Sequence, residues 1–171
     1  MNISVESPSV TAVKCTECGT TMRATRENYR YDASGLSNVV LENVDIYRCP
    51  KCGGEHVGIS RIEGLHRALA RAIIEKPSRL APEEIRFLRT HLDWSGVDLA
   101  EHIGVTASSV SRWENGREPI GPTAERALRL MVLAREPGGY SLDRLVKLSD
   151  EAEPTRLRMS RRAEEWRARV A

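Results

Sequence analysis

Four cysteines stand in two pairs of identical spacing, Cys15/Cys18 and Cys49/Cys52, and the chain has no others. Each pair lies in a short segment that ends in glycine, residues 14–19 and 48–53. Four thiolates at this spacing are typical of a closed tetrahedral Zn²⁺ site, in which protein sulfurs fill every position. We therefore expect Cys15, Cys18, Cys49 and Cys52 to hold one structural zinc ion per chain.

The same cysteines could instead form a redox dithiol, which needs one thiol of low pKa at the start of a helix. No helical pattern follows either pair, and Cys49 follows a segment of strand composition. His56 lies just beyond the second pair and could replace a ligand, but four cysteines already satisfy the metal. We expect His56 to be an ordinary surface histidine. A structural zinc ion contributes on the order of 10 kcal/mol or more to the folding of a small domain.

Residues 95–116 carry a second pattern with chemical meaning, two short amphipathic helices joined by a tight turn. Thr106 is placed to cap the second helix, and Gly104 can end the first. The inward positions are Leu99, Ala100, Ile103, Val105, Val110 and Trp113. This spacing predicts a helix-turn-helix, whose second helix enters the major groove of DNA. An ordinary helical hairpin in another all-α core is the alternative.

The outward residues of that second helix are the candidates for reading bases. Arg112 can bond guanine O6 and N7 together, a contact that contributes roughly 1–3 kcal/mol of discrimination. An ordinary surface ion pair is the alternative for Arg112. Other residues can reach bases or the phosphates that set register. The predicted DNA contacts are Thr106, Ala107, Ser108, Ser109, Arg112, Asn115 and Arg117.

The elements that must position these residues give an α+β fold. Residues 14–58 have strand composition between the cysteine pairs and predict a zinc ribbon with a β-hairpin or small sheet. Residues 59–79 predict a connector helix, over about 60–74, and a linker. Residues 80–136 predict a compact helical DNA-binding domain that begins at the Pro82 turn and includes a last helix capped by Thr123.

The sequence patterns that indicate secondary structure are weaker at the two ends of the chain. Residues 1–13 predict a flexible leader, although a strand is the alternative. Residues 137–171 predict a helical extension, with one helix over 141–148 and a second over 154–171. The last segment holds six arginines and two glutamates. It predicts a solvated basic helix or tail, with phosphate binding as the alternative.

The bulk composition is that of a globular chain of 171 residues, with 40% hydrophobic and 29% charged residues and a net charge of +2. No apolar run reaches the length of a membrane span, and residues 1–13 do not resemble a secretory signal. We expect a cytoplasmic protein without a membrane partner. Because the sequence has no Ser/His/Asp constellation, phosphate loop or open three-ligand zinc site, we do not expect an enzyme.

Residues 83–133, with their Arg112-Trp113-Glu114-Asn115-Gly116 segment, resemble the Cro/C1-type (Xre-like) repressors. The resemblance implies an ion pair between Arg89 and Glu114 that ties the first helix of the domain to the recognition helix. One position departs from the family, which often has a glutamine that touches the DNA backbone where this chain has Gly96. Ser95 must then cap the helix and serve the phosphate, which puts affinity rather than fold in doubt.

Residues 15–136 together resemble the MqsA-like (YgiT-type) antitoxins, in which a zinc domain precedes a helix-turn-helix. The cysteine pairs, the Ala81-Pro82-Glu83 entry and Ser111-Arg112-Trp113-Glu114 carry this likeness. It implies four cysteine ligands, Ser108 and Arg112 as base contacts, and a homodimer that represses its own operon. It also implies a cognate toxin bound by the N-terminal domain. A stand-alone zinc-ribbon regulator without a toxin is the alternative.

Overall fold

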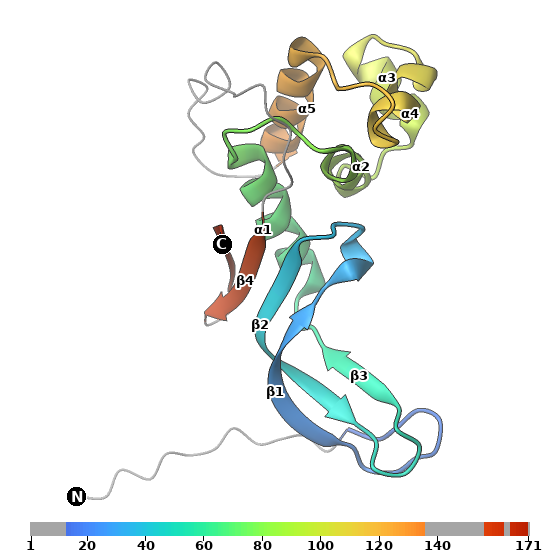
Figure 1. Ribbon diagram of the computed structural model, residues 1–171, viewed down its shortest axis with the longest axis vertical. Coiled ribbons are helices and arrows are strands. Elements are labelled where there is room, and N and C mark those ends of the chain that lie inside the picture. The colour runs from blue at the N-terminus through green and yellow to red at the C-terminus, as the bar shows by residue number, and fades with distance from the viewer. Residues whose placement is uncertain (1–12, 136–155, 163–164, 171) are drawn as a thin grey trace, which may run out of the picture. The chain divides into compact units, whose positions relative to one another are not determined.

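The structure is a computed structural model that describes residues 13–135, 156–162 and 165–170, and its fold is α+β as expected (Figure 1). The described chain divides into two compact units. The first, which we call the cysteine unit, comprises residues 13–27 and 43–60. The second, the helical unit, comprises residues 28–42 and the described residues from 61 onward. The predicted leader over 1–13, except its last residue, and the predicted helix over 141–148 lie outside the described residues.

Two equivalent turns hold the cysteine pairs. In each, the glycine four residues after the first cysteine donates its backbone N–H to that cysteine's carbonyl, at 2.9 Å for Gly19 and 3.1 Å for Gly53. Both glycines have positive φ, 70° and 75°, a conformation that costs other residues strain. Strand β1 (Arg23–Arg30) follows the first turn, whereas β2 (Val39–Arg48) leads into the second and pairs antiparallel with β3 (Glu55–Gly58).

Strand β2 runs through both units and changes phase at Asn43. Val39 and Leu41 are buried before this residue, and Val44 and Ile46 are buried after it. Because side chains of a strand alternate between faces, this switch from odd to even positions requires one extra residue. Asn43 supplies it, with a φ of 55° that asparagine tolerates better than most residues.

The division at Asn43 corrects the predicted boundary of the first domain. Residues 14–58 were expected to fold together as a zinc ribbon, but residues 28–42 belong to the helical unit. The hydroxyl of Tyr31 lies 2.9 Å from His66 Nε2 in that unit, and the Ser37 hydroxyl donates to Glu83 at 2.6 Å. The zinc-ribbon pattern between the cysteine pairs therefore includes a segment that packs on helices.

The described part of the helical unit contains five α-helices: α1 (Ile62–Glu75), α2 (Pro82–His91), α3 (Gly96–Ile103), α4 (Ala107–Glu114) and α5 (Pro122–Arg135). They bury the apolar positions that the sequence indicates, including Leu69, Leu88 and Leu128. Within the described ranges, no helix combines the length and apolar character that crossing a bilayer requires.

The predicted helix over 154–171 is wrong. The described part of this segment forms two antiparallel strands, β4 (Leu157–Arg162) and β5 (Glu165–Val170). β4 joins the sheet parallel to β2, with Leu157 opposite Val39 and Met159 opposite Leu41. Leu157 and Met159 are both buried, a period of two that suits a strand with one buried face. Arginine and glutamate favour helices by propensity, but this burial overrides it.

A buried ionic network joins α1, α2 and α5. The Arg129 side chain is 1% exposed and donates to the carbonyls of Ile74 at 2.8 Å, Lys76 at 2.9 Å and Ser78 at 2.7 Å. It also donates to the buried Glu125 carboxylate at 2.8 Å. These contacts satisfy carbonyls at and beyond the C-terminal end of α1. The predicted boundary at residue 80 therefore cuts through one hydrogen-bonded core.

Protonation of His66, the partner of Tyr31, should lower the stability of the helical unit. Burial and the nearby His91 lower the pKa of His66. The unfolded chain, in which histidine has a pKa of about 6.5, then binds the proton more readily than the folded one. Stability is therefore complete above about pH 6.5 and declines as the pH falls below it.

Urea unfolding at about pH 7.5 and about pH 5.5 measures this effect, because the two values bracket the titration of a free histidine. We expect a lower unfolding free energy at the acidic pH, and a smaller difference in His66→Gln. The exposed His102 provides the matched control, since His102→Gln leaves the Tyr31–His66 contact intact. An equal pH dependence in wild type and His66→Gln would contradict the assignment.

Candidate metal centre and DNA-binding interface

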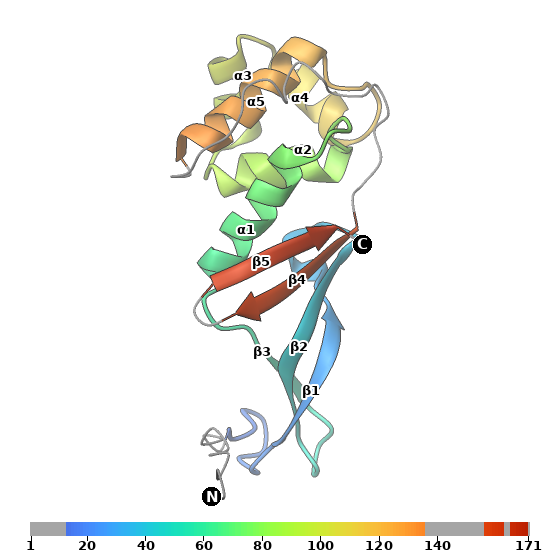
Figure 2. The same ribbon diagram turned by 90° about the vertical axis from the view of Figure 1, so that its left-hand side faces the viewer.

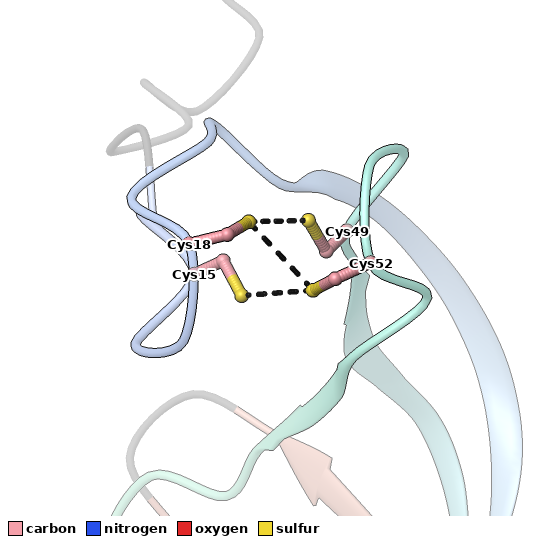
Figure 3. Close-up of side chains that lie close together, drawn as sticks. All are labelled: Cys15, Cys18, Cys49 and Cys52. Atoms are coloured by element: carbon pink, nitrogen blue, oxygen red, sulfur yellow. Dashed lines mark hydrogen bonds between the residues drawn. The ribbon is translucent and has the colours of Figure 1, made fainter.

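The four cysteine sulfurs converge at one end of the cysteine unit (Figure 3). Their Sγ atoms all lie within 4.8 Å of one another. Cys15 Sγ is 3.5 Å from Cys52 Sγ, and Cys18 Sγ is 3.4 Å from Cys49 Sγ and 3.7 Å from Cys52 Sγ. None of the four forms a disulfide, since a disulfide would bring two sulfurs to about 2 Å.

These distances fit a tetrahedral metal ion. A zinc–sulfur bond of about 2.3 Å places the four sulfurs of a tetrahedron about 3.8 Å apart. The observed separations lie close to that value, and the ligands come from two rigid turns. When bound, zinc would crosslink the turns without offering an open position to a substrate. The cysteine cluster confirms a possible four-sulfur metal site, while zinc itself stays a prediction.

Backbone amides prepare the cluster for a cation. The amides of Cys52 and Lys51 lower the pKa of the Cys49 thiol to about 6, so this ligand is a thiolate at neutral pH. For Cys52 an amide hydrogen bond from Gly54 acts in the same direction, but the neighbouring cysteine sulfurs raise its pKa to about 12. Several thiolates cannot share so small a volume without a positive charge. His56 is exposed and outside the cluster, as expected.

In the helical unit, the predicted caps and core residues set the position of α4. The Ser95 hydroxyl accepts the Asp98 amide at 3.2 Å at the start of α3, and Gly104 ends that helix with a φ of 77°. Thr106 caps α4 by accepting the Ser109 amide at 3.1 Å. Val110 and Trp113 bury the inner face of α4. The opposite face carries the residues predicted to meet DNA.

Arg112 lies on this outer face, held by three contacts. Its Nε donates to Glu118 Oε2 at 2.6 Å, and its two terminal nitrogens donate to the hydroxyls of Ser108 at 2.9 Å and Ser109 at 3.1 Å. A guanidinium has five N–H groups, so one on each terminal nitrogen remains beyond these contacts. The side chain is 42% exposed. The ion pair that the sequence offered as the alternative is therefore present, while base reading by Arg112 stays a prediction.

The remaining predicted contacts fall into three groups. Thr106 and Asn115 have structural partners: the Thr106 hydroxyl accepts the Ser109 amide, and the Asn115 side-chain amide donates to the Ser111 carbonyl at 2.7 Å at the end of α4. Ala107 and Arg117 are exposed. Ser108 and Ser109 lie beside Arg112 at the start of the helix. The roles of all these residues towards DNA stay predictions.

The pair implied by the Xre-like resemblance is present. Arg89 on α2 donates to both carboxylate oxygens of Glu114, at 2.6 Å and 3.1 Å, and to the Trp94 carbonyl at 2.7 Å. Arg86 adds a bond to the Glu114 carbonyl at 2.8 Å. A bidentate pair of this kind fixes orientation as well as distance. Both arginines thus anchor the C-terminal end of α4 to α2.

Sequence reasoning missed Glu118 as the partner of Arg112. Glu118 lies in the loop after α4, six residues from Arg112, so no helical spacing relates the two. The sequence does show that the acidic residue Glu118 follows Arg117, but an acidic residue at such a place is ordinary in a loop and does not indicate a partner for Arg112. Acidic residues also slightly outnumber arginines over residues 80–135. A single domain therefore brings little electrostatic attraction to DNA.

Comparison with known proteins identifies one part of the chain. Residues 85–132, which run from α2 into α5, match the helix-turn-helix family. Searches of curated proteins and of solved structures returned no match. The match and the geometry of α3 and α4 together define a helix-turn-helix domain, the DNA-binding domain of a transcription regulator.

Proposed function

We propose that this protein is a sequence-specific transcriptional repressor that binds operator DNA as a homodimer and has no catalytic role. The observation that carries the proposal is the Arg112 side chain, held at the outer face of α4 by Ser108, Ser109 and Glu118. Two N–H groups remain on the guanidinium, and an arginine can donate two N–H groups to the paired acceptors that guanine presents in the major groove.

The contacts around Arg112 would act by preorganisation. Glu118 holds Nε, and the two serines hold the terminal nitrogens, so fewer rotamers must be frozen when DNA binds. The serine hydroxyls can also contact bases or phosphates. Thr106, Asn115 and Arg117 would lie near the DNA backbone, and Ala107 would face the base edges with Ser108 and Ser109. Because the domain carries little net positive charge, a second subunit on a second half-site would supply the missing affinity.

Selection of duplexes from random DNA by the purified full chain tests this proposal. We expect a two-fold symmetric motif with a guanine in each half-site, and half-sites separated by about 34 Å or a multiple of it. Binding should weaken steeply with salt, since phosphate contacts release counterions. Retention of DNA without any enriched motif would contradict a sequence-specific repressor.

We further propose that the protein is an antitoxin. In this proposal the cysteine unit binds and neutralises a cognate toxin, and the helical unit represses the operon that encodes both proteins. The likeness to MqsA-like antitoxins supports it, as does a cysteine cluster in a compact unit apart from the helix-turn-helix. Such a protein would work in the cytoplasm. In the alternative, a stand-alone regulator, the protein would have the same DNA-binding role but no toxin partner.

Co-expression with the adjacent gene separates these two functions. Growth arrest caused by the neighbouring product should be relieved by the wild-type chain and by Arg112→Ala, a variant expected to bind operator DNA more weakly. It should not be relieved by Cys49→Ser. A neighbour that is harmless, or whose arrest the wild-type chain does not relieve, would contradict the antitoxin role and favour the stand-alone regulator.

A further inference from the structure

The chain turns at the end of α4 in a way that places Glu118 beside the outer face of this helix. Gly116 has a φ of 66° and donates its N–H to the Trp113 carbonyl at 3.2 Å. The Arg117 N–H donates to the Arg112 carbonyl at 2.9 Å. These two bonds form a Schellman motif, which ends a helix and changes the direction of the chain. The chain then continues from Glu118 into α5 (Figure 2).

The Glu118 carboxylate uses one of its two oxygens in this position. Its Oε2 accepts a hydrogen bond from Arg112 Nε at 2.6 Å, and its Oε1 has no hydrogen-bond partner among the residues that the structure describes. The Glu118 side chain is 50% exposed, so water reaches Oε1 in the free protein. An available acceptor therefore lies beside the arginine that is proposed to read a base.

Arg112 and Glu118 are close enough to contact neighbouring bases. The two atoms that join them are 2.6 Å apart, and successive base pairs of B-form DNA are about 3.4 Å apart. An arginine that bonds both O6 and N7 of a guanine occupies the edge of that base. The carboxylate held next to the guanidinium then faces the edge of an adjacent base.

A carboxylate in this place needs a hydrogen-bond donor when DNA displaces its water, because an unsatisfied buried acceptor is costly. On base edges in the major groove the donors are the amino groups of cytosine and adenine. Guanine and thymine present acceptors there, which would leave the carboxylate unsatisfied and repel it. The phosphates are negatively charged and cannot replace the donor. The carboxylate should therefore favour amino bases and disfavour keto bases.

We propose that Glu118 is a second specificity-determining residue, which accepts a hydrogen bond from the amino group of a cytosine or adenine next to the guanine that Arg112 reads. The inference rests on the proposed function, in which α4 lies in the major groove. Arg112 then requires acceptors on one base, and Glu118 requires a donor on the next. Because the two side chains carry opposite charges, the pair selects sequence and adds little general attraction to phosphates.

Glu118→Gln tests this role in the full chain, with duplexes built on the motif that the wild type selects from random DNA. In this panel the base pair on each side of the guanine is replaced in turn by the other three. We expect the wild type to bind about tenfold or more weakly when guanine or thymine replaces the amino base on one side. In Glu118→Gln this preference should fall to about twofold or less, because an amide donates as well as accepts.

The preference for guanine at the Arg112 position should persist in Glu118→Gln, since the glutamine oxygen can still accept from Arg112 Nε. The melting temperature should match that of the wild type, because an exposed ion pair contributes little stability. Glu63→Gln makes the same change at an exposed position of α1 and should leave both base preferences unchanged.

An unchanged preference for the amino base in Glu118→Gln would overturn the inference. Loss of the guanine preference together with the amino preference would also overturn it, because Glu118 would then act only by holding Arg112. A wild-type motif that contains the guanine but tolerates every base beside it would overturn the role of Glu118 and leave the repressor intact. A wild-type chain that selects no motif would contradict the proposed function and the inference with it.

Discussion

Cys49→Ser is expected to unfold the cysteine unit while the helical unit stays folded. The small core around the metal site consists of Cys15, Met22 and Cys49, with Val13, Cys18 and Tyr47 packed against it. Three of these residues are the predicted ligands themselves. Without the metal this end of the unit has almost no apolar core, so the metal must supply most of its stability, on the order of 10 kcal/mol.

The measurement combines metal content with the amide spectrum of the full chain. In Cys49→Ser we expect less than one bound metal per chain and loss of amide dispersion over residues 13–27 and 43–60. A strong chelator should give the same spectrum with the wild-type chain. His56→Ala is the matched control, because this exposed histidine lies next to the second turn but outside the cluster. Full metal occupancy and dispersion in Cys49→Ser would contradict a four-cysteine site.

Arg129→Met is expected to destabilise the helical unit by about 3–5 kcal/mol, the cost of breaking a buried ion pair by removing one partner. Methionine fills a similar volume but donates nothing to Ile74, Lys76 or Ser78. It also leaves the Glu125 carboxylate, whose side chain is 1% exposed, without its closest cation. Arg79 lies farther from that carboxylate, at 3.4 Å.

Denaturant unfolding measures this loss against Arg126→Met, the same change at an exposed position of α5. The control should cost no more than about 0.5 kcal/mol. Adding Glu125→Gln to Arg129→Met removes the unpaired charge and should recover part of the stability. Equal losses in Arg129→Met and Arg126→Met would show that the buried network does not join α1 to the helix-turn-helix.

Local patterns explain what the sequence could predict. Ser95, Gly104 and Thr106 act within one helical turn, so their roles follow from residue type and spacing alone. Each cysteine turn is likewise formed by residues close together in the sequence. The sulfurs of the two turns meet because few arrangements of the chain are compatible with both turns. The Arg89–Glu114 pair is long-range, and only the family resemblance indicated it.

Long-range burial explains what the sequence could not predict. Arg129 and Glu125 read as the solvent side of a helix, because polar residues four apart on α5 normally lie there. Their burial depends on the end of α1, which approaches from far away in the chain. The β4–β5 hairpin was missed for a similar reason, since Leu157 and Met159 are buried only because β2 lies beside them. The alternation of apolar and polar residues in this hairpin is visible in the sequence, but it extends over only a few residues.

We propose that Arg112 reads a base, and the most direct test of this claim compares the affinity of Arg112→Ala for the selected duplex with that of Arg117→Ala. We expect Arg112→Ala to bind about 10–100-fold more weakly and to lose its preference for guanine, with an unchanged melting temperature. Arg117→Ala should weaken binding to all duplexes alike and reduce the salt dependence. Unchanged affinity in Arg112→Ala, or a marked fall in its melting temperature, would contradict the claim.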